Sequence, residues 1–231
     1  MSGANAVPVL QLGIGDGAYD LTTETIVTSS STFTLYAYAK ATGGKAIDLS
    51  EEHYISVALT PQIGPVEVPF GSFTFAGSTY DINSPEVVYG NPPLEDDPDR
   101  DPGDLPEHGQ FPTFYVEHGF NFSGLTTGLV NTQYSPSHIP TLESGGPLYF
   151  AEFEVDVTNL LDGFGLHFDL YNTKRKNADL DIDNFAPFSH DAATTLPVTP
   201  VSEPSTLALL LGGLLALFRT SRHHSFRKLH A

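Results

Sequence analysis

Regular alternation of apolar and polar residues limits the folds open to this chain more than any other feature. In segment 151–157, an alanine, a phenylalanine and two valines alternate with two glutamates and an aspartate. Segments 32–39, 55–59 and 164–171 show a similar alternation. Because successive side chains of a β-strand point to opposite faces, each segment predicts a strand with one buried and one solvated face.

The body of the chain, residues 7–195, has no sustained 3.6-residue apolar stripe. Glycines and prolines, 21 and 18 in the whole chain, interrupt it at short intervals. Segments 90–109 and 131–147 predict two long loops. The sequence therefore predicts an all-β domain, an antiparallel β-sandwich of jelly-roll-like or Ig-like type, followed by a Pro/Thr linker at 196–204.

The composition excludes several classes of function. The chain contains no cysteine, so it has no disulfide, no thiolate nucleophile and no cysteine-ligated metal. Its 28 acidic and 10 basic residues give a formal net charge of -18. A surface of that sign repels nucleic-acid phosphates, and we expect no nucleic acid among the partners.

An acidic loop offers the first candidate metal site. Seven carboxylates lie within residues 95–107, which hold a single basic residue. Among them, Asp97, Asp99 and Asp101 alternate like the oxygen ligands of a calcium loop. Gly103 comes one position late for an EF-hand turn, however, and no helices flank the segment. The alternative is a solvated acidic loop that keeps the surface soluble.

Asp179, Asp181 and Asp183 form the second candidate calcium site. They alternate with two aliphatic residues, so on a regular strand the three carboxylates point to one side. Three like charges in a row repel each other unless a cation, solvent or the basic residues at 174–176 relieve them. The alternative is an ordinary exposed strand face.

The run Ser189-His190-Asp191 contains the residue types of a hydrolytic triad. Residues adjacent in the chain do not give the converging geometry of nucleophile, base and orienter. No strand–elbow–helix pattern surrounds the serine. We therefore predict no catalytic residues and a protein that is not an enzyme.

The C-terminal segment has the order of a membrane-sorting signal. A polar motif is followed by twelve apolar residues or glycines at 207–218 and then by a basic end, 219–231. The motif consists of Val201, Ser202, Glu203, Pro204, Ser205 and Thr206, and the basic residues are Arg219, Arg222, Arg227 and Lys228. The pattern predicts a separate hydrophobic helix over 205–218. A basic flank stays on the cytoplasmic side, which places the body outside.

The apolar run is shorter than the roughly 17–25 residues of a spanning helix. Its length favours a removable signal over a lasting anchor. A disordered basic terminus and a buried C-terminal helix are the other interpretations.

This segment, residues 201–231, resembles the PEP-CTERM sorting domain of bacterial surface proteins. Glu203-Pro204, the Leu/Gly-rich run and the arginine cluster carry the resemblance, with Ser202 where the usual motif has proline. The resemblance implies processing by a membrane enzyme of the exosortase type and transient contact with the cytoplasmic membrane. The protein would then be exported to the cell envelope, cell surface or extracellular matrix.

The N-terminal residues 1–6 fit this destination. Ala4-Asn5-Ala6 has the small-residue pattern of a signal-peptide cleavage site. We interpret residues 1–6 as the remnant of a secretory signal whose basic and apolar parts lie upstream.

The body resembles the choice-of-anchor N family, which carries one β-rich body on different anchoring tails. The stretch 185–192, with Phe185-Ala186-Pro187-Phe188, is similar to the end of such bodies, and segments 9–12, 19–20 and 32–36 match near the start. The family implies no catalytic residues.

Three functions follow as expectations. The first is an exported, non-catalytic surface or matrix protein with a role in biofilm or adhesion. The second is a module that binds calcium, extracellular polysaccharide or both, using exposed Tyr36 and Tyr38 and the acidic loop. The third is a glycoside hydrolase with two paired carboxylates.

Overall fold

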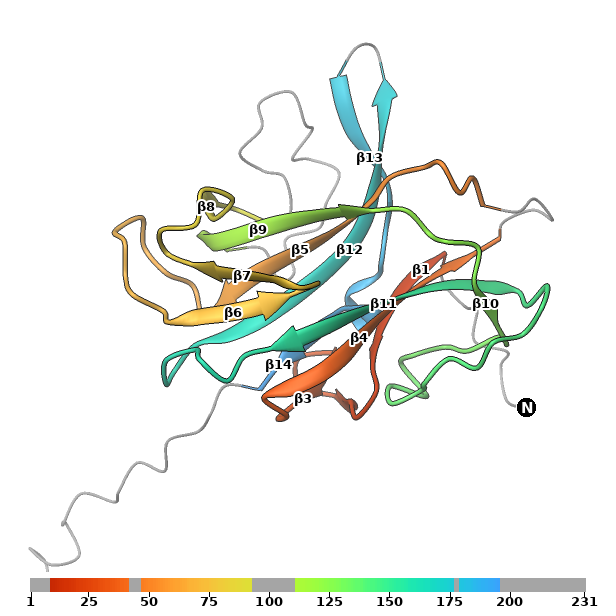
Figure 1. Cartoon of the computed structure of the whole chain (residues 1–231), viewed down its shortest axis with the longest axis horizontal. Helices are drawn as coiled ribbons and strands as arrows, with labels where there is room; N and C mark the ends of the chain where they lie inside the picture. Colours follow the sequence, from red (N-terminus) through yellow and green to blue (C-terminus); the bar gives the residue numbers. More distant parts are fainter. Residues whose placement is uncertain (1–8, 42–46, 93–110, 177–178, 196–231) are drawn as a thin grey trace, which may run out of the picture. The chain divides into compact units, whose positions relative to one another are not determined.

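The computed structural model describes residues 9–41, 47–92, 111–176 and 179–195. They form an all-β structure of two sheets, shown in Figure 1, with one 3₁₀ turn, η2, at Phe188–His190 and no α-helix in these ranges. The described elements all belong to a unit that ends at Pro197. The predicted all-β body is confirmed.

The first sheet, sheet A, has six strands in the order β1-β4-β11-β6-β7, with β10 paired to β11. Their bounds are Leu10–Ile14 for β1, Thr32–Lys40 for β4, Ser72–Phe75 for β6, Ser78–Asp81 for β7, Thr126–Thr127 for β10 and Leu148–Asp156 for β11. All its pairs are antiparallel. Ala76 and Gly77, both at positive φ, supply the two-residue turn of the β6–β7 hairpin.

The second sheet, sheet B, has eight strands in the order β2-β3-β14-β12-β5-β9-β8, with β13 paired to β12. Their bounds are Ala18–Asp20 for β2, Thr25–Thr28 for β3, His53–Thr60 for β5, Val88–Gly90 for β8, Thr113–Phe120 for β9, Gly165–Lys176 for β12, Asp179–Phe185 for β13 and Ala192–Thr194 for β14. The β14–β3 pair is parallel, so this sheet is mixed. The antiparallel prediction is wrong for that one pair.

Aromatic contacts between the sheets form the centre of the core. Phe168 of β12 packs edge-on against Phe33 of β4, with ring centroids 6.1 Å apart, and lies 6.0 Å from the ring of Phe75 on β6. Phe75 in turn stacks on Phe153 of β11 at 5.5 Å. Phe168 and Phe75 are fully buried. One cluster of apolar residues therefore spans both sheets and holds them together.

The strands expected from alternation are present, at β4, β5, β11 and β12. On β11, Phe153 and Val155 are buried while Glu152 and Glu154 are exposed, as predicted. Segment 131–147 is a loop without strands, also as predicted. The other predicted loop, 90–109, falls mainly on residues 93–110, which lie outside the described ranges.

The prediction of exposed Tyr36 and Tyr38 is wrong. They are only 6 % and 0 % exposed, because residues of the loop that precedes β11 cover this part of sheet A. The Tyr38 hydroxyl donates a hydrogen bond to the carbonyl of His138, 3.0 Å away. The buried Gln11 side chain on β1 also fixes the loop, since its amide donates to the carbonyl of Val130 at 2.9 Å. Neither tyrosine is available to stack on a sugar.

None of the helical turns in the described ranges is long and apolar enough to span a bilayer. The predicted helix at 205–218, the basic end at 219–231, the linker at 196–204 and the N-terminal remnant 1–6 lie outside these ranges. They remain predictions.

Truncation of the central aromatic residue tests the packing of the two sheets. We expect Phe168→Ala to lower the free energy of unfolding by about 3–5 kcal/mol, because it removes a fully buried ring and leaves a cavity. Chemical denaturation followed by circular dichroism measures the change. Val66→Ala is the control, since Val66 is 74 % exposed and its truncation should change stability by less than about 0.5 kcal/mol. Equal effects of both substitutions would contradict the core assignment.

Candidate functional site

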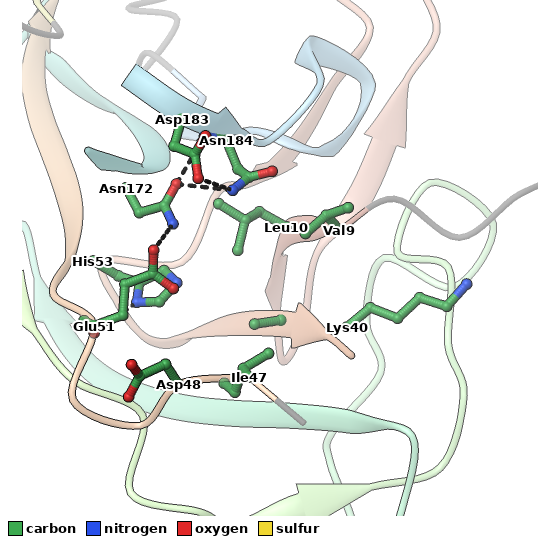
Figure 2. A pocket seen from close by; sticks show the side chains of 11 residues that line it. Val9, Leu10, Lys40, Ile47, Asp48, Glu51, His53, Asn172, Asp183 and Asn184 are labelled. Carbon is green, nitrogen blue, oxygen red and sulfur yellow. Dashed lines mark hydrogen bonds between the residues drawn. The ribbon is translucent and has the colours of Figure 1, made fainter. Parts of the chain in front are cut away.

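A cavity of about 270 Å³ lies where residues of both sheets meet the loop that precedes β5 (Figure 2). Apolar side chains form one part of its wall: Val9, Leu10, Ala39 and Ile47. Polar side chains form the rest: Lys40, Asp48, Glu51, His53, Asn172, Asp183 and Asn184. The cavity thus combines an apolar surface with three carboxylates and two amides.

Hydrogen bonds fix the polar part of the wall. The Asn172 amide donates to Oε1 of Glu51 at 2.7 Å, and its oxygen accepts from the backbone N–H of Asn184 at 2.7 Å. The Asn184 amide also lies 3.3 Å from Oδ2 of Asp183. Asn172 is buried and sits on β12, so a strand of the sheet positions this chain of contacts. Such preorganised acceptors beside apolar groups suit a ligand rich in hydroxyl groups.

Two further groups of the wall have perturbed acidity. The hydroxyl and backbone N–H of Ser50 donate to Oδ1 of Asp48 and hold the pKa of this carboxyl below its ordinary value. Burial lowers the pKa of His53, whose Nδ1–H donates to the carbonyl of Glu51 at 3.1 Å. Near neutral pH the cavity therefore presents an ionised Asp48 beside a neutral imidazole.

The cavity contains one of the six predicted calcium ligands. Asp183 is exposed and lines the wall. The pairing of β13 with β12 shifts between Asn172 and Thr173, so Asp183 is the extra residue of a β-bulge and the alternation with Asp179 and Asp181 is interrupted there. Asp97, Asp99 and Asp101 lie outside the described residues. The calcium sites remain predictions.

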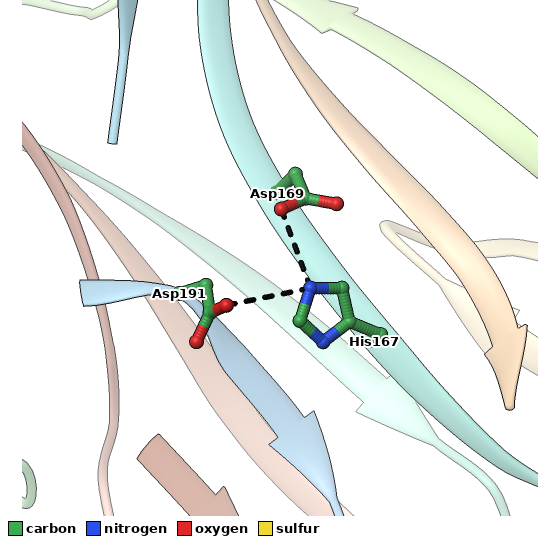
Figure 3. A group of neighbouring side chains, drawn as sticks. All are labelled: His167, Asp169 and Asp191. Carbon is green, nitrogen blue, oxygen red and sulfur yellow. Dashed lines mark hydrogen bonds and ion pairs between the residues drawn. The ribbon is translucent and has the colours of Figure 1, made fainter. Parts of the chain in front are cut away.

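A second group of polar residues, His167, Asp169 and Asp191, is buried on sheet B (Figure 3). Nε2 of His167 lies 3.3 Å from Oδ1 of Asp169 and 3.5 Å from Oδ2 of Asp191. The three residues are 8 %, 5 % and 1 % exposed. Both carboxylates face the same ring nitrogen. We call this group the His–Asp–Asp cluster.

Strand pairing brings the His–Asp–Asp cluster together. His167 and Asp169 are two residues apart on β12 and share a face, opposite to the face that carries Phe168. Asp191 follows η2 and precedes Ala192, which pairs with Phe168 across β14 and β12. The register therefore places Asp191 beside Asp169. The η2 turn determines this position, since it leads the chain from β13 into β14.

Electrostatics couple the three side chains. Burial alone would lower the pKa of His167, but the carboxylates of Asp169 and Asp191 and the hydrogen bond to Asp169 raise it to about 9. Burial raises the pKa of Asp191 to about 8, against the opposing effect of His167. At neutral pH, and without a bound cation, the protons held by His167 and Asp191 therefore neutralise this cluster.

Ser189 and His190 contact each other, but Asp191 does not join them, so the three residues do not form the geometry of a hydrolytic triad. Ser189 Oγ lies 2.8 Å from Nδ1 of His190, and the His190 Nε2 lies 2.9 Å from Oδ1 of Asn131. Asp191, in contrast, turns to His167. Ser189 and His190 are in the short η2 turn, and the contact with Asn131 ties this turn to the loop before β11.

Sequence patterns indicate only part of these groups. His167 and Asp169 fall on the expected polar face of a strand, but that face is buried here, and the prediction of a solvated face is wrong for β12. Asp191 belongs to the run considered for catalysis. Nothing in the spacing relates it to His167, because a hairpin and a 3₁₀ turn lie between them.

Comparison with protein-family models, curated proteins and solved structures gives no match for this chain.

Buried neutral histidines predict a loss of stability in mild acid. Burial lowers the pKa of His190 to about 4, whereas an unfolded histidine titrates near 6.5. Between these values the unfolded chain binds more protons, so stability present above pH 6.5 falls as the pH approaches 4. We expect the free energy of unfolding to fall between pH 8 and pH 5, and His190→Gln to reduce this fall by up to about 2 kcal/mol.

Denaturant unfolding of both proteins at the two pH values measures this effect. The values at pH 8 serve as the baseline, since His190 is neutral there in both states. An unchanged pH dependence in His190→Gln would show that this histidine titrates normally in the folded protein.

Proposed function

We propose that this chain is an exported bacterial surface or matrix protein with a non-catalytic β-sandwich body of jelly-roll-like or Ig-like type. Its C-terminal segment is a PEP-CTERM-like signal that an exosortase-type enzyme recognises at the cytoplasmic membrane. The observation that carries the proposal is the order of the polar motif at 201–206, the apolar run at 207–218 and the basic end. A role in biofilm matrix or adhesion follows from that location.

The composition of the body supports this location. A domain without cysteine folds in the same way in oxidising and reducing compartments. Its stability rests on the aromatic core between the sheets. The strong acidic excess is compatible with a soluble body outside the cell.

The attachment of the C-terminal strand also supports a body carried on its C-terminal end. β14 lies between β3, to which it is parallel, and β12, to which it is antiparallel. The next residue, Thr195, donates its backbone N–H to the carbonyl of Thr28 at 2.7 Å. The strand nearest to the sorting segment is thus held on both sides, and a load applied from that end is spread over two neighbouring strands.

Processing of the C-terminal segment tests the proposal. In the source bacterium, we expect protein recovered from the envelope to lack the apolar run 207–218. The double substitution Glu203→Ala and Pro204→Ala should retain it, because the motif that the processing enzyme recognises is lost. Intact-mass spectrometry measures the difference. Pro197→Ala, in the linker before the motif, is the matched control and should be processed normally. A wild-type envelope protein that keeps all residues to Ala231 would refute processing.

The second candidate function is binding of an extracellular polysaccharide, with or without calcium. The cavity at Glu51, Asn172 and Asp183 favours it, because carboxylate and amide acceptors fixed beside an apolar wall match the hydroxyl groups and ring faces of a sugar. This site replaces the buried Tyr36 and Tyr38 as the candidate sugar-binding surface. A binding role is compatible with display on the surface.

A glycan array probed with and without Ca²⁺ tests this candidate. We expect Asp183→Asn to weaken binding of a retained glycan about 10–100-fold, because a charged hydrogen bond is worth about 1.5–3 kcal/mol. Asp156→Asn, at a partly exposed carboxylate on β11 outside the cavity, should bind like the wild type. Equal binding by both variants would exclude the cavity, and release of reducing ends from the glycan would indicate a glycoside hydrolase instead.

A further inference from the structure

We propose that the His–Asp–Asp cluster is a binding site for a divalent transition-metal ion and that Zn²⁺ is the ion it fits best. His167 supplies an imidazole nitrogen, and Asp169 and Asp191 each supply a carboxylate oxygen. This site is separate from both predicted calcium sites and from the cavity. It goes beyond export and glycan binding, neither of which requires it.

The convergence of two carboxylates on one nitrogen is the first observation. Nε2 of His167 carries at most one proton, and this proton cannot form well-aligned hydrogen bonds to both Asp169 and Asp191. The three ligand atoms all lie within 4.8 Å of one another, so an ion between them would reach all three with at most a small movement of a carboxylate. Ligands about 2.0–2.1 Å from Zn²⁺ at the corners of a tetrahedron lie about 3.3–3.4 Å apart. The observed separations from Nε2, 3.3 and 3.5 Å, are close to that value.

Unsatisfied polar atoms are the second, independent observation. In the part of the chain that the structure describes, neither carboxylate oxygen of Asp191 accepts a hydrogen bond, although the residue is 1 % exposed. Its contact with His167 is a 3.5 Å ion pair, and the hydroxyl of the neighbouring Thr25 donates to the carbonyl of Thr23. The Ser56 hydroxyl is also fully buried and without a partner in the described residues. Ser56 of β5 pairs directly with Asp169 across the two strands. Buried polar atoms without partners are costly, and a metal ion would satisfy the carboxylate of Asp191.

Charge compensation supports the same occupant. Without a metal, the cluster needs protons on both the imidazole and a carboxyl group to be neutral, whereas a doubly charged cation with a neutral imidazole balances two ionised carboxylates. Buried charges in proteins are paired or coordinate metals. The net charge of the occupied site would be zero.

The donor set selects the kind of ion. Ca²⁺ and Mg²⁺ prefer oxygen ligands alone, so the imidazole argues against both. One nitrogen and two carboxylate oxygens suit Zn²⁺, which accepts a water molecule as its fourth ligand in sites with three protein ligands. Ser56 lies beside Asp169, on the side of β12 opposite to β14.

Zinc binding by the full-length chain tests the proposal. The chain also contains His223, His224 and His230 near its C-terminus, so the triple variant His223→Asn, His224→Asn and His230→Asn serves as the common background. After treatment with a chelator, titration with Zn²⁺ alone and elemental analysis after dialysis should give one retained ion per chain. X-ray absorption at the zinc edge should show a single imidazole and oxygen ligands at about 2.0–2.1 Å.

Substitutions in the cluster give the specific readout. We expect His167→Gln and Asp191→Asn to weaken Zn²⁺ binding by more than the roughly 10–100-fold that loss of an outer-shell partner costs. The matched control is His118→Gln on β9, a half-buried histidine that packs against Phe75 in the core between the sheets. It should bind Zn²⁺ like the background variant. Circular dichroism of each variant checks the fold.

Two results would overturn the proposal. The first is the absence of a retained ion in the background variant, in which case the cluster is an internal ion pair neutralised by protons. The second is unchanged affinity in folded His167→Gln. Where a cluster variant does not fold, the absorption spectrum of the background variant decides, since two or more imidazoles or none around the metal would exclude this site.

Discussion

The alternation of side chains along β12 is the constraint on which most of this structure depends. One face of the strand carries Leu166, Phe168 and Leu170, all fully buried in the core between the sheets. The other face carries His167 and Asp169. Because the side-chain period of a strand is two residues, a register slip by one position would place the charged pair in the core between the sheets and turn the aromatic ring to the opposite face. The same pairing that secures the core thus fixes the His–Asp–Asp cluster.

The partners of β12 add the remaining parts of both candidate sites. β5 runs beside it from Gly165 to Asn172 and brings Ser56 opposite Asp169. Asp191, directly before β14, completes the cluster. β13 places Asn184 and Asp183 at the cavity, beside Asn172. The two sites are therefore at different positions along one strand. Each depends on contacts between residues that are distant in the sequence.

Most of the strands could be predicted from the sequence, but the surroundings of their outer faces could not. Local alternation is enough to recognise β4, β5, β11 and β12, because it reflects the geometry of a single strand. The burial of Tyr38 depends on a loop more than ninety residues away in the sequence. In that loop, the carbonyl of His138 accepts a hydrogen bond from the Tyr38 hydroxyl. The parallel pairing of β14 with β3 is equally non-local. Neither contact produces a pattern in the local sequence around the residues involved.

The sequence by itself determined the all-β class, the absence of thiol chemistry and the expected order of the sorting segment, since composition and short-range periodicity carry this information. It also pointed to Asp183 as a candidate ligand. Only the tertiary structure decided that Asp183 lines a cavity with Glu51 and Asn172, and that His167, Asp169 and Asp191 meet. The physical reason is that a binding site needs side chains to converge in space. That convergence is set by strand order and register, which depend on pairing between segments far apart in the chain.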